Sequence, residues 1–522
     1  MLHSKLVHDF LADSASLHPE KNAFFALGHW YTYGQLDKRA NQLARLLVKS
    51  GLQKGQRVAL LLENSAQYVI TYYGILKAGG ITVALNTEST ADDIAYIVRD
   101  CCVRFLVMNP KLFPRIMALP GDLSKCEGRP QESPLERVWV WSDQKMPRAE
   151  DVRLNAILLP EAMEGESTAP PSIRMIDLDT ASIVYTSGST GKPRGATLSH
   201  LNIVSNTRSI AEYLELTSED RIMVVLPFYY IYGKSLLNTH FFVGGSVVVD
   251  NRFLYPNVVL QTMREQEATG FAGVPSTFTI LLSRSSLKST KFPSLRYVTQ
   301  AGGAMPPAVQ KEVAEAFAPA RLFIMFGATE ASARLSYLDP RDLPRKWGSI
   351  GKAIPNIDLF VADKTGAPLG PGREGEIVAR GSNIMSGYWN HPEETEKVLR
   401  NGLYYTGDIG TTDDEGFLYV VGRSKDMIKI GGNRVSAKEI EEALYEHPSI
   451  LEAAVIGVPD NVLGEAPKAF IVLKKGSSQD LIEGLPAFLQ QHLAVYKIPK
   501  LYELRDALPK NDSGKVLKLK LK

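Results

Sequence analysis

The segment YTSGSTGKPRG, residues 185–195, follows the apolar run ASIVY at residues 181–185, which has the character of a buried strand. Its glycines let backbone N–H groups converge on an anion, and its hydroxyl groups can donate further hydrogen bonds. Lys192 and Arg194 add positive charge that can neutralise phosphate. A flexible Gly/Ser linker is the ordinary alternative, but such linkers seldom place Lys-Pro-Arg directly after a buried strand. The segment therefore predicts a phosphate-binding loop formed by Thr186, Ser187, Gly188, Ser189, Thr190, Gly191 and Lys192.

This loop differs from the Walker loop of P-loop NTPases. Gly188 and Lys192 stand closer together than the first glycine and the lysine of that motif, and Pro193 occupies the position of its Ser or Thr. The spacing therefore excludes a P-loop kinase.

The length and charge of the chain limit the kinds of protein to consider. With 522 residues it is too long for one hydrophobic core, so we expect a large composite domain and at least one smaller domain. The 59 Lys and Arg residues nearly balance the 57 Asp and Glu residues, which gives no reason to expect nucleic acid or an anionic membrane as a partner. The sequence does not indicate an oligomeric state.

Three features predict a cytoplasmic protein without a membrane span. No uninterrupted apolar run approaches the ~18 residues that a membrane helix needs. The N-terminal segment reaches Asp9 too early for the apolar core of a signal peptide. The three cysteines, two of them adjacent at Cys101 and Cys102, show neither a disulfide framework nor metal-ligand spacing.

The first half of the chain alternates helical and strand-like patterns. Helical spacing of apolar residues over 35–50 and 67–77 alternates with buried strand patterns over 57–62 and 81–85. This alternation is typical of a parallel sheet with helices on both faces, so the fold class is α/β. Residues 124–172 are rich in Pro, Glu and Ser and predict an irregular segment.

The C-terminal part has a different texture, with short strands separated by glycines. Strands are expected at 376–379, 418–421, 427–430, 453–458, 469–473 and 500–504, and a helix at 486–493. Ser436, with Glu439 three residues on, predicts the start of another helix. The predicted division is a large domain over residues 1–422, a hinge over 423–426 and a small α+β domain over 427–522.

The loop at 186–195 closely resembles the signature loop of the adenylate-forming superfamily, which contains acyl-CoA synthetases, adenylation domains of peptide synthetases and beetle luciferases. Further motifs similar to that family's occur in its order. They are Ala301-Gly302-Gly303-Ala304, Met325-Phe326-Gly327-Ala328-Thr329-Glu330, Tyr405-Thr406-Gly407-Asp408, Gly422-Arg423-Ser424-Lys425-Asp426 and Leu508-Pro509-Lys510-Asn511-Asp512-Ser513-Gly514-Lys515. Ordered motifs are far more specific than one loop. The resemblance implies a large multi-layer N-terminal domain and a small mobile C-terminal domain.

The resemblance also implies nucleotide-binding roles. Adenine binds at the turn of Gly302, Gly303 and Ala304, and Phe326, before Gly327, stacks on the base. Thr329 bonds the α-phosphate, and Glu330 holds Mg²⁺, a metal that prefers hard oxygen ligands. Asp408 accepts hydrogen bonds from the ribose hydroxyls, and Arg423 reaches the ribose or the phosphate.

For the small domain, the resemblance implies a catalytic lysine, a pivot and a path for a thiol. Lys515 is the candidate catalytic residue and Lys425 the hinge pivot. Lys515 could instead belong to a basic tail, but the preceding Ser-Gly favours catalysis, and we expect Lys518, Lys520 and Lys522 to face solvent. Lys429, Gly431 and Gly432 would line the tunnel for a pantetheine arm.

The implied reaction is ATP-dependent formation of an acyl-adenylate with release of pyrophosphate, followed by transfer of the acyl group to coenzyme A. A free-standing enzyme that loads the phosphopantetheine of a carrier protein stays open, because both acceptors end in the same arm. A luciferase-like oxidation would need a special substrate. A catalytically silent nucleotide-binding paralogue is disfavoured by Glu330, Asp408 and Lys515.

The acid substrate is less clearly marked. Its pocket should draw on Tyr230, Tyr232, Lys234, Gly273 and Val274. Many relatives carry a histidine near Tyr230, so their carboxylate-orienting arrangement is in doubt here. The absence of Asp and Glu between Pro227 and Val249 weakens an amino-acid substrate, and the aromatic cluster favours an aryl or medium-length acyl group, although core packing explains part of it. Lys234 could pair with a second carboxylate or a polar substituent of the substrate, or it could be a surface lysine.

Overall fold

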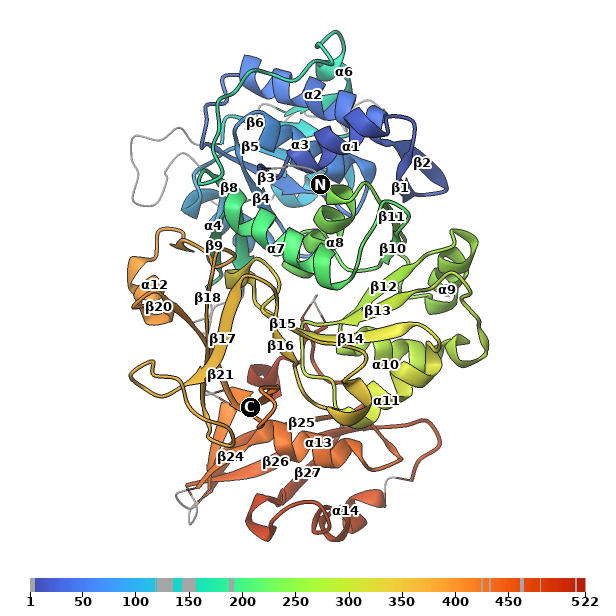
Figure 1. The fold of residues 1–522 in the computed structure, drawn as a ribbon, viewed down its shortest axis with the longest axis vertical. Helices are drawn as coiled ribbons and strands as arrows, with labels where there is room; N and C mark the ends of the chain where they lie inside the picture. The colour runs from blue at the N-terminus through green and yellow to red at the C-terminus, as the bar shows by residue number, and fades with distance from the viewer. Residues whose placement is uncertain are drawn as a thin grey trace.

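In a computed structural model of the chain, the described residues are 5–117, 119, 135–142, 156–186, 192–423, 426–430, 433–460, 464–478, 480–511 and 514–521. The molecule is elongated, with the N-terminal half at one end and the last hundred or so residues at the other (Figure 1). Strands and helices are mixed throughout, which confirms the predicted α/β class. Within the described ranges, no helix is both long and apolar enough to cross a membrane.

The first large sheet is parallel in its centre and antiparallel at its edges. Its strands lie in the order β16 (Lys352–Ala353), β15 (Ser336–Leu338), β14 (Arg321–Phe326), β13 (Tyr297–Gln300), β12 (Gly270–Gly273), β10 (Arg221–Val224), β11 (Ser246–Val249), β1 (Asn22–Ala26) and β2 (His29–Thr32).

The second large sheet contains the strand that enters the predicted phosphate loop. Its order is β19 (Gly387–Tyr388), β9 (Arg194–Ser199), β8 (Thr180–Thr186), β4 (Ile81–Ala84), β3 (Arg57–Leu61), β5 (Val103–Met108), β6 (Arg137–Val140) and β7 (Ala156–Leu158). Strands β8 and β9 are antiparallel, so the loop between them reverses the chain at the edge of the parallel part.

Helices fill the space between the two sheets and cover their outer faces. The central core combines apolar residues of both sheets with those of α1 (Asp9–Leu17), α2 (Tyr33–Lys49), α3 (Ala66–Lys77), α7 (His200–Tyr213) and α8 (Ile231–Phe242). The outer face of the first sheet packs on α9 (Pro256–Glu265), α10 (Pro275–Arg284) and α11 (Pro307–Ala316). The outer face of the second packs on α4 (Ala91–Asp100) and α5 (Phe113–Met117). Further short helices in this part include α6 (Leu159–Met163), η1 (Pro110–Leu112) and η2 (Leu287–Ser289).

A smaller antiparallel sheet carries the predicted ribose site. It consists of β17 (Ile357–Ala362), β18 (Gly375–Gly381), β21 (Leu403–Thr412) and β20 (Leu399–Arg400), with β22 (Leu418–Arg423) beside β21 and α12 (Pro392–Val398) preceding β20. One segment of the first part is bonded to this sheet, because the backbone at Ile350 and Gly351 forms hydrogen bonds with Leu418 on β22.

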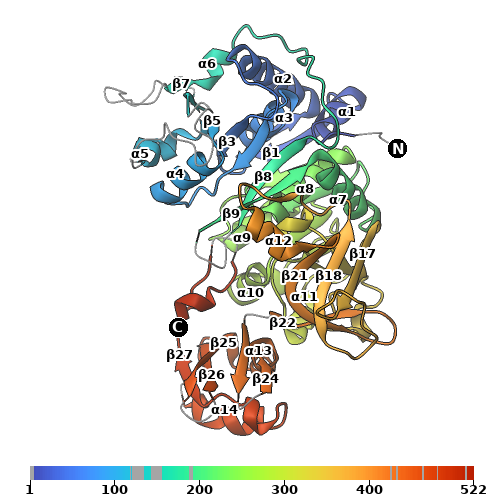
Figure 2. The same cartoon turned by 90° about the vertical axis from the view of Figure 1, so that its left-hand side faces the viewer.

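The C-terminal part has its own sheet and core and forms a distinct lower body in Figure 2. Its strands are β24 (Asn433–Ser436), β23 (Met427–Ile430), β26 (Gly464–Leu473), β25 (Ile450–Asp460) and β27 (Leu501–Leu504). Its helices are α13 (Ala437–Tyr445), α14 (Leu481–Leu489), η6 (Val495–Lys497) and η7 (Lys518–Leu521).

Most predicted elements are confirmed, including the start of α13, where Ser436 Oγ accepts the N–H of Glu439 at 3.3 Å. The helix predicted over 486–493 is displaced, because α14 begins at Leu481 and contains Pro486. The prediction of an irregular segment over 124–172 is wrong in part. The apolar residues Val138, Trp139 and Val140 form β6 in spite of their polar surroundings. Cys101 is a buried free thiol.

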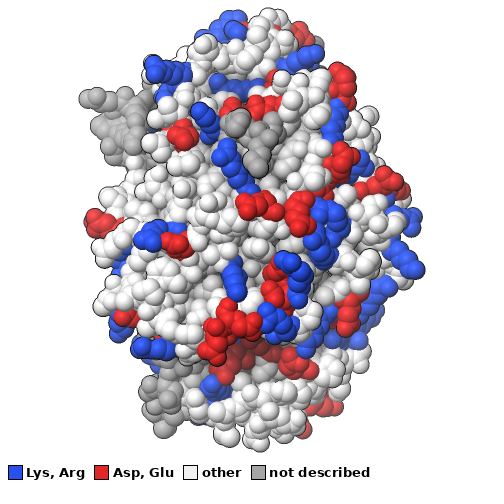
Figure 3. All heavy atoms as spheres, in the orientation of Figure 1, with Lys and Arg blue, Asp and Glu red and all other residues white. Residues whose placement is uncertain are grey.

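The face drawn in Figure 3 shows Lys and Arg interspersed with Asp and Glu. This mixture fits the near-zero net charge, although acidic side chains gather at the lower centre of the view.

Candidate active site

A cavity of about 630 Å³ lies where the two large sheets, the ribose sheet and the C-terminal part meet. Its walls include the carboxyl ends of parallel strands: Ala84 of β4, Thr186 of β8, Gln300 of β13 and Phe326 of β14. Ligands of α/β proteins bind at such strand ends, and the volume is in the range of small-molecule sites. The cavity is therefore the candidate active site.

The cavity contains most residues predicted to touch the nucleotide. They are Thr186, Gly302, Gly303, Ala304, Phe326, Gly327, Thr329, Glu330, Asp408, Arg423 and Lys515. These residues come from six motifs spread over more than half of the chain, and the fold brings them to one place. Their individual roles stay predictions.

Two of the glycines have backbone reasons to be glycine. Gly302 has φ +83°, a conformation that favours glycine, and an added Cβ would lie 2.9 Å from Val274 Cγ1. At Gly327 an added Cβ would lie 1.9 Å from the carbonyl oxygen of Ala333. The turn is further fixed by Gln300, whose Nε2 donates to the Gly303 carbonyl at 2.8 Å.

Glu330 stands at the end of β14 in the short helix η3 (Thr329–Ala331), and its carboxylate faces the cavity. Its Oε1 accepts a hydrogen bond from the Tyr388 hydroxyl at 2.7 Å, and its carbonyl accepts the N–H of Met385 at 2.8 Å. Burial and the Glu330 charge raise the pKa of Tyr388 well above its usual value, so this hydroxyl keeps its proton and donates. The Arg194 guanidinium lies 5.7 Å from the Tyr388 ring centre.

The donor set at Glu330 fits Mg²⁺. Among the described residues, no group of three or more His, Cys, Asp or Glu side chains is arranged to hold a metal ion. Mg²⁺ commonly uses one or two carboxylates together with substrate phosphates and waters, so a single carboxylate in a phosphate site suits it. Thr329, buried beside Glu330, adds a hydroxyl to the same wall.

Asp408 and Arg423 face each other on the paired strands β21 and β22, with Arg423 Nε 2.9 Å from Asp408 Oδ1. Burial raises the pKa of Asp408, and the charges of Arg423 and Lys515 oppose that rise. The charge of Asp408 in turn raises the pKa of Arg423. The pair thus presents a carboxylate whose second oxygen can accept a hydrogen bond.

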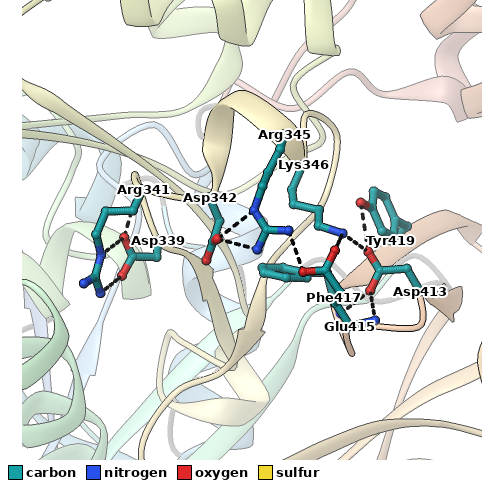
Figure 4. Close-up of polar contacts among 9 residues, drawn as sticks. All are labelled: Asp339, Arg341, Asp342, Arg345, Lys346, Asp413, Glu415, Phe417 and Tyr419. Atoms are coloured by element: carbon teal, nitrogen blue, oxygen red, sulfur yellow. Dashed lines mark hydrogen bonds and ion pairs between the residues drawn. The ribbon is translucent and has the colours of Figure 1, made fainter.

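Surface ion pairs fasten the β21–β22 turn to the first part of the chain (Figure 4). Lys346 Nζ lies 2.7 Å from Asp413 Oδ2 and 2.6 Å from Glu415 Oε1. Arg345, at the end of η4 (Leu343–Arg345), binds Asp342 at 2.7 Å and Glu415 at 2.5 Å, and both cations lie against the ring of Phe417. This network holds the strands that carry Asp408 and Arg423.

Lys515 reaches the cavity from the last loop of the chain. Its N–H donates to Asn511 Oδ1 at 2.8 Å, and its carbonyl accepts the N–H of Asn511 at 2.9 Å, which shapes a tight turn. Gly514, with φ +78°, lies against the first part of the chain, where an added Cβ would be 2.1 Å from Ser276 Oγ. The loop is thereby seated with Lys515 within electrostatic range of Asp408.

Other cavity residues were not expected from the sequence. Lys518 lines the cavity, and its Nζ lies 2.6 Å from Glu441 Oε1, so the expectation that it faces solvent is wrong. Burial raises the pKa of Glu441, and Lys518 opposes the rise. Lys438 also lines the cavity, and Tyr388 supports Glu330. Lys438, Glu441 and Tyr388 belong to none of the family motifs, and Lys518 was assigned to the basic tail, so nothing in the sequence marked these contacts.

The predicted acyl-pocket residues divide between the cavity wall and the core behind it. Tyr230 lines the cavity, whereas Tyr232 is buried and its hydroxyl lies 2.8 Å from Thr299 Oγ1. Lys234 is only 1% exposed, so the alternative of a surface lysine is wrong. Gly273 and Val274 are also buried behind the wall.

The remaining predicted residues lie elsewhere or outside the described ranges. Lys192 is exposed, with Nζ 5.4 Å from the centre of the Tyr96 ring. Lys429 is exposed on β23, and its backbone N–H donates to Glu465 Oε2 at 2.7 Å. Ser187, Gly188, Ser189, Thr190, Gly191, Lys425, Gly431 and Gly432 lie outside the described residues.

The chain is similar to known proteins over nearly all of its length. Residues 11–389 match the family described as AMP-binding enzyme, and residues 439–515 match the AMP-binding enzyme C-terminal domain. The chain therefore belongs to the AMP-binding enzyme family. The prediction that the chain is an acyl-CoA synthetase of the adenylate-forming superfamily is therefore confirmed. The chain is an AMP-forming acid–thiol ligase.

Two relatives and two solved structures illustrate the match. A long-chain-fatty-acid–CoA ligase of Bacillus subtilis is 36% identical, with 100% of this chain and 94% of that protein aligned. A feruloyl-CoA synthase of Amycolatopsis is 33% identical, with 97% and 96% aligned. An anthranilate CoA ligase in complex with anthranoyl-AMP superposes with a TM-score of 0.90 at 28% identity, covering 100% of this chain and 97% of that one. ATP-bound MatB from Rhodopseudomonas palustris gives a TM-score of 0.85 at 31% identity, with 98% of both chains covered.

Proposed function

We propose that this enzyme uses ATP and Mg²⁺ to convert a carboxylic acid into an acyl-adenylate and then transfers the acyl group to coenzyme A, releasing AMP. The observation that carries this proposal is the single cavity in which Glu330, Asp408, Arg423 and Lys515 converge. A location in the cytoplasm, where ATP and coenzyme A are both available, is part of the proposal.

The adenylation step is mainly an electrostatic problem, because a carboxylate must attack an α-phosphate that is already negative. The Lys515 ammonium can approach both groups from the C-terminal side of the cavity, and Arg423 adds positive charge on the ribose side. Mg²⁺ held by Glu330 and the ATP phosphates would supply Lewis-acid stabilisation of the leaving pyrophosphate. Positioning and preorganised charge are sufficient, so no covalent protein nucleophile is required.

The thioester step needs a second access route to the adenylate. We infer that the small domain, residues 427–522, turns about the hinge at residues 423–426, with Lys425 as its pivot. This motion would withdraw Lys515 and bring Lys429, Gly431 and Gly432 to the cavity. The exposed position of Lys429, away from the cavity in this arrangement, is consistent with such a change.

An aryl or acyl acid is the proposed substrate class. Feruloyl-CoA synthase and anthranilate CoA ligase act on aryl acids by their names, and the Bacillus relative acts on long-chain fatty acids. Tyr230, the residue before α8, lines the cavity, and its aromatic ring supports an aryl or medium-length acyl group as substrate.

The test is pyrophosphate release from ATP with a panel of aryl, fatty, dicarboxylic and amino acids, each with coenzyme A, with a phosphopantetheinylated carrier protein, or with neither. We expect acid-dependent release and an acyl-CoA product. Acyl transfer only to the carrier protein would overturn coenzyme A as acceptor. The absence of ATP–pyrophosphate exchange with every acid would overturn adenylation itself.

A further inference from the structure

Lys234 is a buried lysine without an acidic partner. It lies on α8 and is 1% exposed. Its Nζ donates to Ser182 Oγ at 3.2 Å and lies 5.4 Å from the centre of the Tyr72 ring. No carboxylate of the described residues pairs with it. Burial of an unpaired cation is costly, and the described residues offer Lys234 no acid that would offset this cost.

The same lobe shows how a structural buried lysine is treated. Lys77 on α3 is 6% exposed, and its Nζ pairs with Asp37 and donates to Asn41 Oδ1 at 2.6 Å. Lys77 therefore has an acid and an amide oxygen within direct reach. Lys234 has one hydroxyl and one ring, which is an incomplete shell for an ammonium group with three donors.

Lys234 lies one step behind the wall of the cavity. Ala84 and Val184 line the cavity, and Thr82 and Ser182 precede them by two residues on the same sheet face, where Thr82 Oγ1 donates to Ser182 Oγ at 3.0 Å. Two strand residues span about 7 Å. Tyr230 lines the cavity as well, and Lys234 follows it by one helical turn. The Lys234 ammonium therefore lies behind three residues of the cavity wall, namely Ala84, Val184 and Tyr230.

A second buried cation, Arg334, also contacts a side chain of α8. Arg334 is 2% exposed, and its Nε has no hydrogen-bond partner among the described residues. Its guanidinium lies 4.7 Å from the centre of the Tyr232 ring on α8, and its charge opposes the rise that burial causes in the pKa of Tyr230. No acid of the described residues pairs with Arg334 either.

We propose that the acid activated by this enzyme carries a second, distal carboxylate, and that Lys234 binds this group at the inner end of the acyl pocket. The inference rests on the proposed function and names its substrate class. The substrate's first carboxylate meets the α-phosphate near Lys515, and the wall of Ala84, Val184 and Tyr230 yields to admit the distal end. Lys234 is thus a specificity-determining residue and takes no part in the chemical step.

The experiment compares kcat/KM for dicarboxylic acids with kcat/KM for monocarboxylic acids of matched length and shape, measured by pyrophosphate release in the full-length enzyme. We expect the wild type to prefer the dicarboxylates. Lys234→Met should reduce that preference roughly 10- to 100-fold, as expected for loss of a charge-assisted hydrogen bond, and should leave the KM for ATP unchanged.

Lys77→Met is the matched control, because it removes a buried lysine of the same lobe that already has partners. It should keep the substrate preference. A wild type that releases pyrophosphate with monocarboxylates but does not prefer dicarboxylates overturns this inference and leaves the proposed function intact. The same holds if Lys234→Met, shown by circular dichroism to be folded, retains the full preference. Absence of activity with every acid would instead overturn the proposed function.

Discussion

At the scale of single residues, buried charge is compensated at some positions of this molecule and uncompensated at others. Asp408 lies against Arg423 within the cavity wall, with one carboxylate oxygen occupied. Among the described residues, the contacts of the Lys234 ammonium are one hydroxyl and one aromatic ring. The pairing of Asp408 fits a binding group that is already oriented. The contacts of Lys234 fit a group whose charge is compensated when a ligand binds.

The Asp408 carboxylate should contribute to ATP binding through its charge. Asp408→Asn keeps the size of the side chain but weakens the ribose contact and the pair with Arg423, so kcat/KM for ATP should fall roughly 10- to 100-fold. The rate of ATP–pyrophosphate exchange, measured as a function of ATP concentration, gives this kcat/KM. Asp358→Asn, which removes one partner of the exposed pair with Arg380, is the control and should leave ATP kinetics unchanged. Equal ATP kinetics in both variants would contradict a nucleotide-binding role for Asp408.

Tyr388 should act on the metal through Glu330. Tyr388→Phe removes the hydroxyl that orients Glu330 Oε1, and loss of such an outer contact typically costs about 10- to 100-fold in metal affinity. The Mg²⁺ concentration needed for half-maximal pyrophosphate release should therefore rise. An unchanged Mg²⁺ titration curve would show that Glu330 is oriented without Tyr388.

Lys234 should also leave a signature in the pH dependence of stability. Burial lowers its pKa to about 7, whereas the unfolded chain has an ordinary lysine pKa near 10.5. Between these values the unfolded state binds the extra proton, so this group makes the folded state more stable as pH rises from about 7 towards 10.5. Lys234→Met removes the penalty. Its Tm should exceed that of the wild type near neutral pH, and the difference should shrink at higher pH. A difference that does not vary with pH would rule out a neutralised buried lysine.

At the scale of elements, the hairpin of β21 and β22 sets the position of Asp408 and Arg423. Figure 4 shows how Lys346 bridges Asp413 and Glu415 across from the ring of Phe417. The side chain of Lys346 is 11% exposed, whereas Arg345 and Glu415 are each 51% exposed, so the part of the cluster that is shielded from water is Lys346.

Loss of this cluster should loosen the hairpin. Lys346→Met should lower the Tm, and the deficit should shrink in high salt, because salt screens the wild-type ion pairs but has less to screen in the variant. Differential scanning calorimetry at two salt concentrations measures this effect. Arg380→Met, in an exposed pair, should change the Tm little. Identical behaviour of the two variants would mean that the cluster does not hold the hairpin.

Elements with strong local signals were predictable from the sequence, and those defined by distant partners were not. The start of α13 follows from the local cap at Ser436, and the strand before the phosphate loop follows from its apolar run. Strand β6 was missed, because its few apolar residues are stabilised by pairing with β5 and β7 and by packing in the core, which are contacts with distant segments. Helix α14 accommodates Pro486 in its interior, where local rules expect proline at the start of a helix.

The candidate site follows the same division. Motif residues such as Glu330 and Lys515 were identified from the sequence because the family resemblance marks them. Tyr388, Glu441 and Lys518 were not, because their contacts join residues about sixty or more positions apart. The burial of Lys234 was equally hidden, since a lysine in a helix gives no sign of which face is enclosed.

At the scale of the whole molecule, the cavity is shared between two parts of the chain that have separate cores. The loop of Lys515 is seated on Ser276 and Val274 of the first part, so the arrangement described here has the lysine at the cavity. A second arrangement, with the small domain turned, is required by the proposed thioester step.

The most direct test of this account is to measure the two half-reactions separately in Lys515→Ala. We predict that formation of the acyl-adenylate from acid and ATP falls at least about 100-fold, the scale expected for loss of a positioned charge in the transition state. Transfer of the acyl group from preformed acyl-adenylate to coenzyme A should proceed at close to the wild-type rate. Equal loss of both half-reactions, or adenylation at the wild-type rate, would contradict the role given to Lys515.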